Sequence, residues 1–422
     1  MQVLRGMRDV LPPESLKWQH LERIAGDIFS SFGYILSITP VLESTDLFCR
    51  SIGEGTDVVS KEMYTFKDKG EESVTLRPEG TASIMRAYLA SGELYGKLFK
   101  TWYWGPMFRY ERPQKGRYRQ FYQFGLEAIG ADSPYVDAEL IYMLDYFYKT
   151  IGILDVQVHL NSIGCDACRP AYKEALVKFL NTQSAGLCED CKRRIETNPL
   201  RVLDCKNEAC SKLIYGAPVM KDFLCPTCVS HNEVVTSTLN SLGVKYIINN
   251  NLVRGLDYYS RTVFEFVTEK IGGRQNALGG GGRYDGLSAQ LGSKTVPSVG
   301  YAGGVERTIM MMEESEKKLY TDAYMAMLDE KTMKAYLPLI LEVKKLCVGK
   351  SVKFVEDDLK VRDVKKHLSR ADKAGARFAI IAGETELNNK TIIVKDLLNK
   401  KEEKVNADAT EVARRLFEKS DR

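Results

Sequence analysis

The sequence predicts an α+β domain built on an antiparallel sheet, interrupted by a cysteine-rich insertion and followed by a small α/β domain. The sheet is indicated by Thr101–Gly130, where two runs of alternating side chains flank a basic loop. The insertion is indicated by residues 162–232, which carry eight of the ten cysteines and little alternation. The last domain is indicated by residues 331–422, where strand and helix patterns alternate. The first domain therefore comprises residues 1–325 apart from the insertion, with a polar linker over Glu313–Thr321.

Length and charge limit the possible classes of protein. A chain of 422 residues is long enough for two or three domains with substantial cores. The net charge of +4 is too small to indicate nucleic-acid binding, but residues 331–422 carry 22 Lys and Arg against 15 Asp and Glu. That excess fits a polyanionic partner and fits a solvated helical surface equally well. The sequence shows neither a signal peptide nor an apolar run as long as a membrane span, so we expect a cytoplasmic protein with reduced cysteines.

The first elements are a helix and a strand. An irregular lead-in over Leu4–Glu14 precedes a helical pattern from about Ser15 to Phe32, which ends at Gly33. The following segment, Tyr34–Glu43, is strand-like, and Pro40 within it favours a position at the edge of a sheet. An edge strand with apolar neighbours suits a subunit interface, although an edge covered within one chain would give the same pattern.

A hairpin and a second helix come next. Met63–Leu76 predicts two strands that turn at Asp68–Gly70, and the segment from Arg77 to Thr81 then opens a helix that runs to about Ala90. Glu79 and Thr81 suit the caps of this helix, and the same two side chains can also bind a ligand.

Alternation divides the Thr101–Gly130 hairpin into an apolar face and a polar face. The polar face carries Arg109, Glu111, Phe121, Gln123 and Glu127, with a gap at Gly125. An ordinary half-buried sheet would turn such charges toward water. Here the connecting loop adds further cations, including Arg112 and Arg117. An aromatic ring, fixed cations and carboxylates on one face favour a nucleotide and a small zwitterion as ligands.

Two glycine-rich segments follow the insertion. Four consecutive glycines in Ala277–Gly286 usually indicate a flexible loop, but the flanking strand-like sequence favours a close approach of the backbone to a ligand. In Gly300–Arg307, paired glycines lead into a helix whose first turn carries an arginine, which suits a bound phosphate.

The cysteines have the spacing of metal ligands. Three C-x2-C pairs and one C-x4-C pair provide thiolates for up to two tetrahedral Zn²⁺ sites. The eight residues are Cys165, Cys168, Cys188, Cys191, Cys205, Cys210, Cys225 and Cys228. A set of reduced, buried thiols is the alternative. Bound zinc would be structural, because sulfur would fill every ligand position.

Several motifs together resemble those of a known family. The segment FRYERPQKGRYRQFYQFGLEAIG, residues 108–130, resembles the second signature motif of class II aminoacyl-tRNA synthetases in the form found in histidyl-tRNA synthetases. Tyr34–Glu43 and Gly300–Arg307 resemble the first and third motifs of that class. Leu252–Thr262 resembles a segment peculiar to histidyl-tRNA synthetases. The resemblance covers nearly all of the chain and implies a class II catalytic domain at 1–325, an anticodon-binding domain at 331–422 and a homodimer.

The resemblance also implies an activity and a set of site residues. The expected reaction is ATP-dependent ligation of L-histidine to tRNA(His) through a histidyl-adenylate, with release of AMP and diphosphate and with Mg²⁺ bridging phosphate oxygens. Arg254 and Arg109 are the expected catalytic residues at the α-phosphate. ATP would also contact Glu111, Arg117, Phe121 and Arg307. Histidine would contact Glu79, Gly80, Thr81, Gln123, Glu127, Tyr258, Tyr259 and Tyr284. The acceptor end of the tRNA would contact Arg112 and Gln114.

Two other classes of protein fit less well. The regulatory subunit of ATP phosphoribosyltransferase shares the first domain, but such relatives lack the anticodon-binding domain and usually lose the catalytic arginines, and this chain retains both. A generic RNA-binding scaffold would not explain the polar face of the hairpin.

Overall fold

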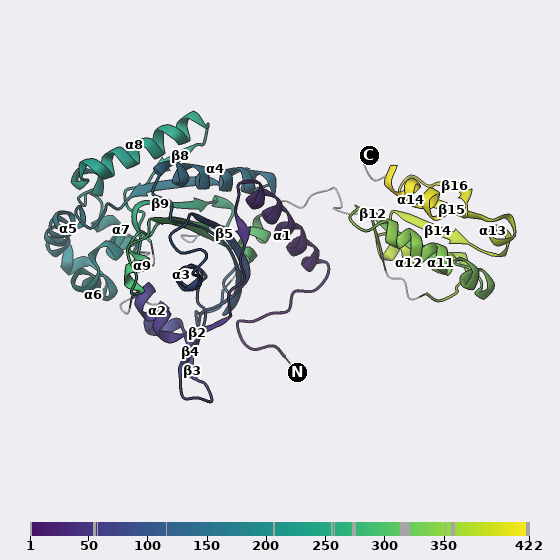
Figure 1. The fold of residues 1–422 in the computed structure, drawn as a ribbon, viewed down its shortest axis with the longest axis horizontal. Coiled ribbons are helices and arrows are strands. Elements are labelled where there is room, and N and C mark those ends of the chain that lie inside the picture. Colours follow the sequence, from purple (N-terminus) through teal and green to yellow (C-terminus); the bar gives the residue numbers. More distant parts are fainter. Residues whose placement is uncertain are drawn as a thin grey trace. The chain divides into compact units, whose positions relative to one another are not determined.

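The chain forms two compact units, Met1–Glu313 and Glu314–Arg422, in a computed structural model (Figure 1). The structure describes residues 2–53, 56, 58–114, 116–205, 207–254, 256, 258–271, 276–312, 321–350, 352–355 and 359–418. Among these residues, no helix is long and apolar enough to cross a bilayer.

An eight-stranded sheet forms the centre of the first unit, in the order β1-β5-β6-β11-β10-β9-β7-β8. Its strands are β1 (Ile35–Leu36), β5 (Phe99–Phe108), β6 (Gln120–Ile129), β7 (Gln157–Ser162), β8 (Tyr246–Ile248), β9 (Ser260–Val267), β10 (Ala277–Arg283) and β11 (Ser298–Gly304). In this order, all neighbours between β5 and β7 run antiparallel. The edge strands pair in parallel, β1 with β5 and β8 with β7. The predicted α+β class with an antiparallel sheet is confirmed.

The predicted hairpin is β5–β6, with a continuous register from Phe99↔Ile129 to Phe108↔Gln120. Its apolar face lies under α1 (Glu14–Ser31) and α4 (Pro134–Thr150), where Phe124 stacks on Phe29 and meets Phe147 edge to face. Alternation along β6 therefore assigned this face correctly, because the core could form only on the aromatic side.

Two strand predictions were too long. The expected strand Tyr34–Glu43 is reduced to β1 and β2 (Leu42–Ser44), with no strand between them, in the segment that contains Pro40. Proline lacks the N–H that a ladder requires. The sequence also predicts a strand over Ile151–Asn161, but this strand begins only at Gln157, because the chain after α4 first makes a turn closed by Ile153 N donating to Tyr148 O at 2.9 Å.

A smaller sheet and short helices complete this part of the unit. The predicted hairpin at Met63–Leu76 forms β3 (Tyr64–Lys67) and β4 (Ser73–Leu76), which join β2 in a three-stranded sheet. The predicted helix after Arg77 is α3 (Thr81–Ala90). Around them lie α2 (Thr45–Ile52), η1 (Val58–Glu62) and α9 (Leu287–Gln290). Helix α10 (Val305–Met311) packs instead on β6 and β11 of the large sheet, with η5 (Glu269–Ile271) beside it.

The described residues from 163 to 232 form helices joined by turns, and none of them lies in a strand. It contains α5 (Arg169–Gln183), η2 (Ser184–Gly186), α6 (Glu189–Thr197), η3 (Pro199–Val202), α7 (Glu208–Leu213), η4 (Met220–Phe223) and the first part of α8 (Pro226–Ser241). Helix α8 packs against α4, so the end of the segment rests on the main domain.

The second unit has its own five-stranded sheet in the order β13-β12-β14-β15-β16. Its elements are β12 (Thr321–Met327), α11 (Glu330–Leu346), β13 (Val352–Phe354), α12 (Val364–Lys373), β14 (Phe378–Ala382), α13 (Glu384–Asn389), β15 (Thr391–Asp396), β16 (Lys401–Asn406) and α14 (Ala409–Glu418). The expected first domain ends at residue 325, within β12, and the expected last domain begins only at residue 331. Strand β12 nevertheless belongs to the second unit, because it pairs in parallel with both β13 and β14. The expected linker lies outside the described residues, except for Thr321.

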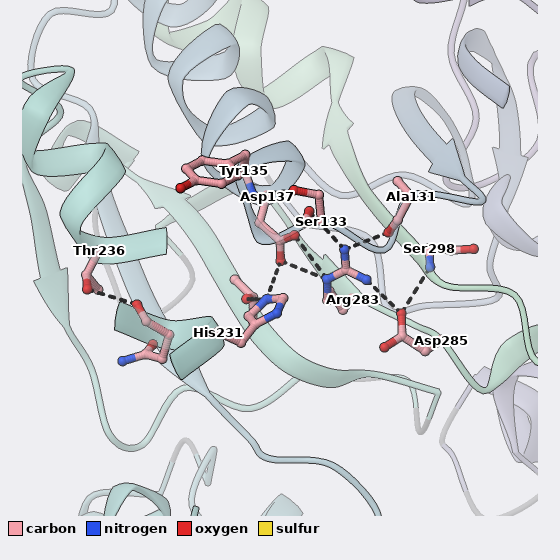
Figure 2. A network of polar contacts seen from close by, with 11 residues as sticks. Ala131, Ser133, Tyr135, Asp137, His231, Thr236, Arg283, Asp285 and Ser298 are labelled. Atoms are coloured by element: carbon pink, nitrogen blue, oxygen red, sulfur yellow. Dashed lines mark hydrogen bonds and ion pairs between the residues drawn. The ribbon is translucent and has the colours of Figure 1, made fainter. Parts of the chain in front are cut away.

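A buried network of charges joins α4, α8 and β10 (Figure 2). At its centre Arg283, which is 0% exposed, donates from Nε to Asp137 Oδ2 at 3.0 Å and from Nη1 to Asp285 Oδ1 at 2.9 Å. His231 of α8 lies 3.3 Å from the other oxygen of Asp137 and 3.1 Å from the Thr262 hydroxyl. The network fixes the end of β10, and with it the residue that follows Arg283.

Removing one partner from this network should cost considerable stability. Asp137→Ala would leave the buried guanidinium of Arg283 without the carboxylate that its Nε contacts. We therefore expect the free energy of unfolding to fall by about 3–5 kcal/mol. Equilibrium urea unfolding measures the change. Asp27→Ala removes an exposed ion pair with Arg23 and should shift the urea midpoint little. Equal shifts for the two variants would contradict the assigned role of the network.

Candidate active site

A cavity of about 620 Å³ lies over the polar face of the large sheet. Its lining includes four arginines and four glutamates: Arg109, Arg117, Arg254, Arg307, Glu79, Glu111, Glu265 and Glu306. Charges are costly to bury unless they are paired. Most of these groups have a partner within the protein.

Glu79 closes one end of the cavity and also caps α3. Its two carboxylate oxygens accept hydrogen bonds from the backbone N–H groups of Thr81 at 2.7 Å and Ala82 at 2.9 Å. Burial raises the pKa of Glu79 despite these bonds. The capping function expected for Glu79 is present, and the residue still lines the cavity.

Glu127 is wholly buried beside Glu79. Its Oε1 accepts from the Thr81 hydroxyl at 2.6 Å, and its Oε2 accepts from the Tyr284 hydroxyl. Burial raises the pKa of Glu127 to about 8. A Cβ at Gly300 on the adjacent strand would collide with this carboxylate, so the position requires glycine. Glu127, Gly80 and Tyr284 lie behind the cavity wall and are absent from its lining.

Arg254 lies across the glycine-rich strand β10. Its guanidinium forms an ion pair with Glu265 of β9 and lies 5.7 Å from the ring centre of Tyr259. Burial lowers the pKa of Arg254, but Glu265 and Tyr259 outweigh that effect and raise it. A Cβ at Gly280 would collide with this guanidinium. The four glycines therefore form a strand that a cation approaches closely, and they do not form a flexible loop.

The other three arginines converge from the hairpin and from α10. Arg109 Nε donates to the carbonyl of Pro78 at 2.9 Å, and its guanidinium lies 5.4 Å from the ring centre of Phe121. Arg117 Nη1 donates to Glu111 at 2.6 Å. Burial, together with the nearby Arg117, lowers the pKa of Arg307. Cations held close to one another in this way favour a polyanionic ligand.

The tyrosines form a wall beside the carboxylates. Tyr258 and Tyr259 have ring centres 4.7 Å apart, and Tyr258 meets Tyr284 edge to face at 5.7 Å. Gln123 lines the same end of the cavity, and its buried Oε1 has no hydrogen-bond partner within the part of the chain that the structure describes. The cavity thus has a cationic end and an end made of carboxylates, hydroxyls and an amide.

Two of the expected site residues lie outside the cavity. Arg112 and Gln114 are exposed on the loop of the hairpin, where the backbone of Gln114 pairs with that of Arg117. Neither lines the cavity.

Sequence reasoning missed three residues of the site. Tyr103 of β5 places its ring between Gly80 and Gly125, at each of which a Cβ would collide with it, so the gap expected at Gly125 is filled. Glu265 pairs with Arg254, and Glu306 accepts from Tyr122 N at 3.1 Å, with burial raising its pKa to about 7. The only signal for Tyr103 is its register with Gly125, which the sequence alone does not show.

The eight cysteines of the insertion form two groups, each able to hold a metal ion. One group is Cys165, Cys168, Cys225 and Cys228, and the other is Cys188, Cys191, Cys205 and Cys210. Within each group the sulfur atoms all lie within 4.8 Å of one another. Sγ–Sγ distances of 3.6 and 3.9 Å exclude disulfide bonds and resemble the edge of a ZnS₄ tetrahedron, about 3.8 Å for Zn–S bonds of about 2.3 Å.

Backbone amides support the same geometry. Cys225 N donates to Cys168 Sγ at 3.1 Å, and Cys188 N donates to Cys210 Sγ at 3.2 Å. Such bonds stabilise the thiolate form, which is the form that binds metal. The first and last cysteine pairs of the sequence therefore share one group, and the two middle pairs share the other.

Comparisons with known proteins agree with this geometry. A family model described as histidyl-tRNA synthetase matches residues 6–308, and one described as an anticodon binding domain matches residues 324–418. Two relatives named histidine–tRNA ligase are each 46% identical: one from Geobacter metallireducens covers 91% of this chain and 92% of its own length, and one from Nitratidesulfovibrio vulgaris covers 98% of each. The apo structure of S. aureus histidyl-tRNA synthetase matches 99% of this chain and 100% of its own, at 33% identity and a TM-score of 0.77. The chain belongs to the histidyl-tRNA synthetase family of class II aminoacyl-tRNA synthetases.

Proposed function

We propose that the chain is a histidine–tRNA ligase that uses ATP to join L-histidine to tRNA(His). Its family membership and the names of its relatives support this activity. The observation that carries the proposal is the cavity itself, in which four arginines face an end made of buried carboxylates and tyrosines. One end suits a triphosphate and the other suits a small zwitterion with a polar ring.

The first step is formation of the histidyl-adenylate. A carboxylate oxygen of histidine attacks the α-phosphorus of ATP, the bond from that phosphorus to the bridging oxygen breaks, and diphosphate leaves. Little proton transfer is needed, so positioning and charge stabilisation account for most of the rate. Arg109 and Arg254 contact the α-phosphate in this scheme. Arg117 and Arg307 contact the outer phosphates, and Glu111 and Phe121 contact the adenine.

The second step transfers the histidyl group. A terminal ribose hydroxyl of the tRNA attacks the carbonyl carbon of the adenylate, and AMP leaves. The exposed residues Arg112 and Gln114 on the hairpin loop are available to the acceptor end of the tRNA. The second unit, with the basic excess of residues 331–422, binds the anticodon region, and the first unit, interrupted by 162–232, carries catalysis.

Recognition of histidine depends on buried polar groups. Glu79, Thr81 and Gln123 bind its ammonium group, and the unpartnered Oε1 of Gln123 offers an acceptor for it. Glu127 and Tyr259 bond the two imidazole nitrogens, while Gly80, Tyr258 and Tyr284 shape the pocket. A side chain that leaves such partners unpaired is rejected by ~10⁴-fold or more.

The cavity also fits a divalent cation that accompanies ATP. Glu265 and Glu306 line it and provide carboxylate oxygens, which are the ligands that Mg²⁺ prefers. When bound, Mg²⁺ neutralises charge on the phosphate oxygens.

We further propose that the enzyme is a cytoplasmic homodimer. The edge strand β1 and the segment after it expose apolar side chains, with Ile35 71% and Ile38 86% exposed. An open strand edge with apolar neighbours favours pairing with a second copy. The cytoplasm contains the tRNA substrate and keeps thiols such as those of the insertion reduced.

The two cysteine groups would each bind a structural Zn²⁺. The sulfur spacing, the amide-to-sulfur bonds and the all-sulfur ligand set support this assignment. Four protein ligands leave no open position for substrate, so the metal would stabilise the insertion and take no part in the reaction.

The central test is histidine-dependent exchange between ATP and diphosphate. Arg254→Ala should reduce its rate on the order of 100-fold or more, because a fixed cation at the transferring phosphoryl group is lost. Circular dichroism should show an unchanged fold. Arg23→Ala, an exposed variant far from the cavity lining, serves as the control. A near-normal rate for Arg254→Ala would count against its assigned role.

Removal of residues 314–422 should separate the two steps. The described residues that line the cavity all belong to the first unit, so exchange between ATP and diphosphate should change little. Charging of tRNA should fall on the order of 100-fold, because binding at two linked sites is reduced to binding at one. Aminoacylation assays with radioactive histidine measure the effect, and an unchanged charging rate would contradict the anticodon assignment.

Burial of Glu127 predicts how stability depends on pH. Its pKa is about 8 in the folded state against an ordinary 4.5, so between these pH values the folded chain keeps a proton that the unfolded chain has lost. Stability therefore falls as pH rises through this window, by up to about 1.4 kcal/mol per pH unit from this group. Glu127→Gln should remove that slope, as followed by thermal unfolding of both proteins from pH 5 to 8. Parallel pH profiles for the two proteins would refute the linkage.

A further inference from the structure

The segment of residues 249–261, which carries Arg254 and Tyr259, is bonded to the cysteine-rich insertion along its main chain. The carbonyl of Arg254 accepts from Arg201 Nη1 at 3.4 Å, and the carbonyl of Tyr259 accepts from Arg169 Nη2. The backbone of Arg261 forms two hydrogen bonds with the start of the insertion. Its N–H donates to the carbonyl of Gly164, and its carbonyl accepts from the N–H of Ile163, each at 2.8 Å. The side chains of Arg254 and Tyr259 thus line the cavity, while the backbone of the segment forms hydrogen bonds with the insertion.

Each of the two arginines belongs to a different cysteine group. Arg169 directly follows Cys168, and its backbone N–H donates to the carbonyl of Cys165 at 3.1 Å. Arg201 lies in η3, between Cys191 and Cys205 of the other group, and η3 packs against α5 and α6. Each arginine is thus connected to one cysteine group, Arg169 through the backbone and Arg201 through the packing of η3.

The apolar core gives a second connection. One cluster of buried residues includes Cys168, Cys191, Cys210 and Cys228 together with Tyr258 and Tyr259. The core that the cysteines organise is continuous with the tyrosine wall of the cavity. Cys205 and its neighbours Leu203 and Asp204 even line the cavity.

The insertion also contains eight cysteines in two groups that can each hold a metal ion. It is a helical segment of about 70 residues, and segments of this size commonly depend on metal or disulfide links for stability. All eight cysteines are unlinked by disulfides. Metal binding would therefore supply much of its folding free energy.

We propose that each cysteine group, when it binds metal, fixes one arginine, Arg169 or Arg201, and that these two arginines position the segment that carries Arg254 and Tyr259. This inference rests on the proposed function and extends it to two positioning residues, which contact the main chain of the segment and no substrate. Metal loading of the insertion then controls how well the cavity binds the transition state.

The test uses the full chain with Arg169→Met or Arg201→Met. Metal analysis should show the zinc content of the unmodified protein. The kcat of histidine-dependent exchange should fall about 10- to 100-fold, because a small displacement of Arg254 weakens contacts made in the transition state. The KM for ATP should change less. Arg169→Lys and Arg201→Lys should recover part of the rate, because an ammonium group donates to the same carbonyl.

Hydrogen–deuterium exchange provides a readout that a purely structural role would not give. Amides of residues 249–261 should exchange faster in the Met variants, while those of β5 and β6 keep their protection. Arg193→Met is the matched control, since Arg193 lies in the same insertion, is exposed and pairs with Asp190 at 2.8 Å. The control should leave unchanged both the kcat of the ATP–diphosphate reaction and the hydrogen–deuterium exchange of residues 249–261. Removal of zinc from the unmodified protein by a chelator should reproduce the faster exchange, and added zinc should reverse it.

Two results would overturn the inference, and a third would refute the proposed function on which it rests. Unchanged kcat and unchanged exchange of residues 249–261 in both Met variants would overturn it and leave the proposed function standing. Loss of zinc or of protection throughout the insertion would show that the arginines support its fold and not the segment. Absence of histidine-dependent exchange in the unmodified protein would instead refute the proposed function.

Discussion

The burial of opposite charges on one face of the large sheet is the constraint on which the rest of this structure depends. Glu79 and Glu127 are removed from water and are partnered by helix N–H groups and hydroxyls, while Arg254 is paired with Glu265. Each pairing requires its own backbone element in a fixed place, because an unpaired buried charge is strongly destabilising. The hairpin, the glycine-rich strand and the start of α3 are therefore held in one arrangement before any substrate enters.

The same requirement explains which parts of the fold could be predicted from the sequence. Alternation identified the β5–β6 hairpin and its apolar face, because a core formed by Phe124 and its neighbours can lie only on one side. The spacing of the cysteines indicated metal ligands, since C-x2-C pairs bring two sulfur atoms together locally. Both features are properties of short stretches of chain.

The features that escaped prediction depend on contacts between distant stretches. The sequence did not show that the first cysteine pair joins the last, because that pairing follows from how α5 and α8 meet. Tyr103 was missed because its place beside Gly125 depends on the register of two strands. The strand β12 was assigned to the wrong side of a domain limit, since its partners β13 and β14 lie downstream of it.

The glycines of the cavity have a consequence for how this enzyme could be altered. At Gly80, Gly125, Gly280 and Gly300, even a methyl group would collide with a side chain of the site. A substitution at any of these four positions therefore requires a side chain of the site to shift, and at Gly280 that group is the guanidinium end of Arg254. Engineering of a new specificity would have to begin with residues that have long, adjustable side chains, such as Gln123, and enlarge the pocket from there.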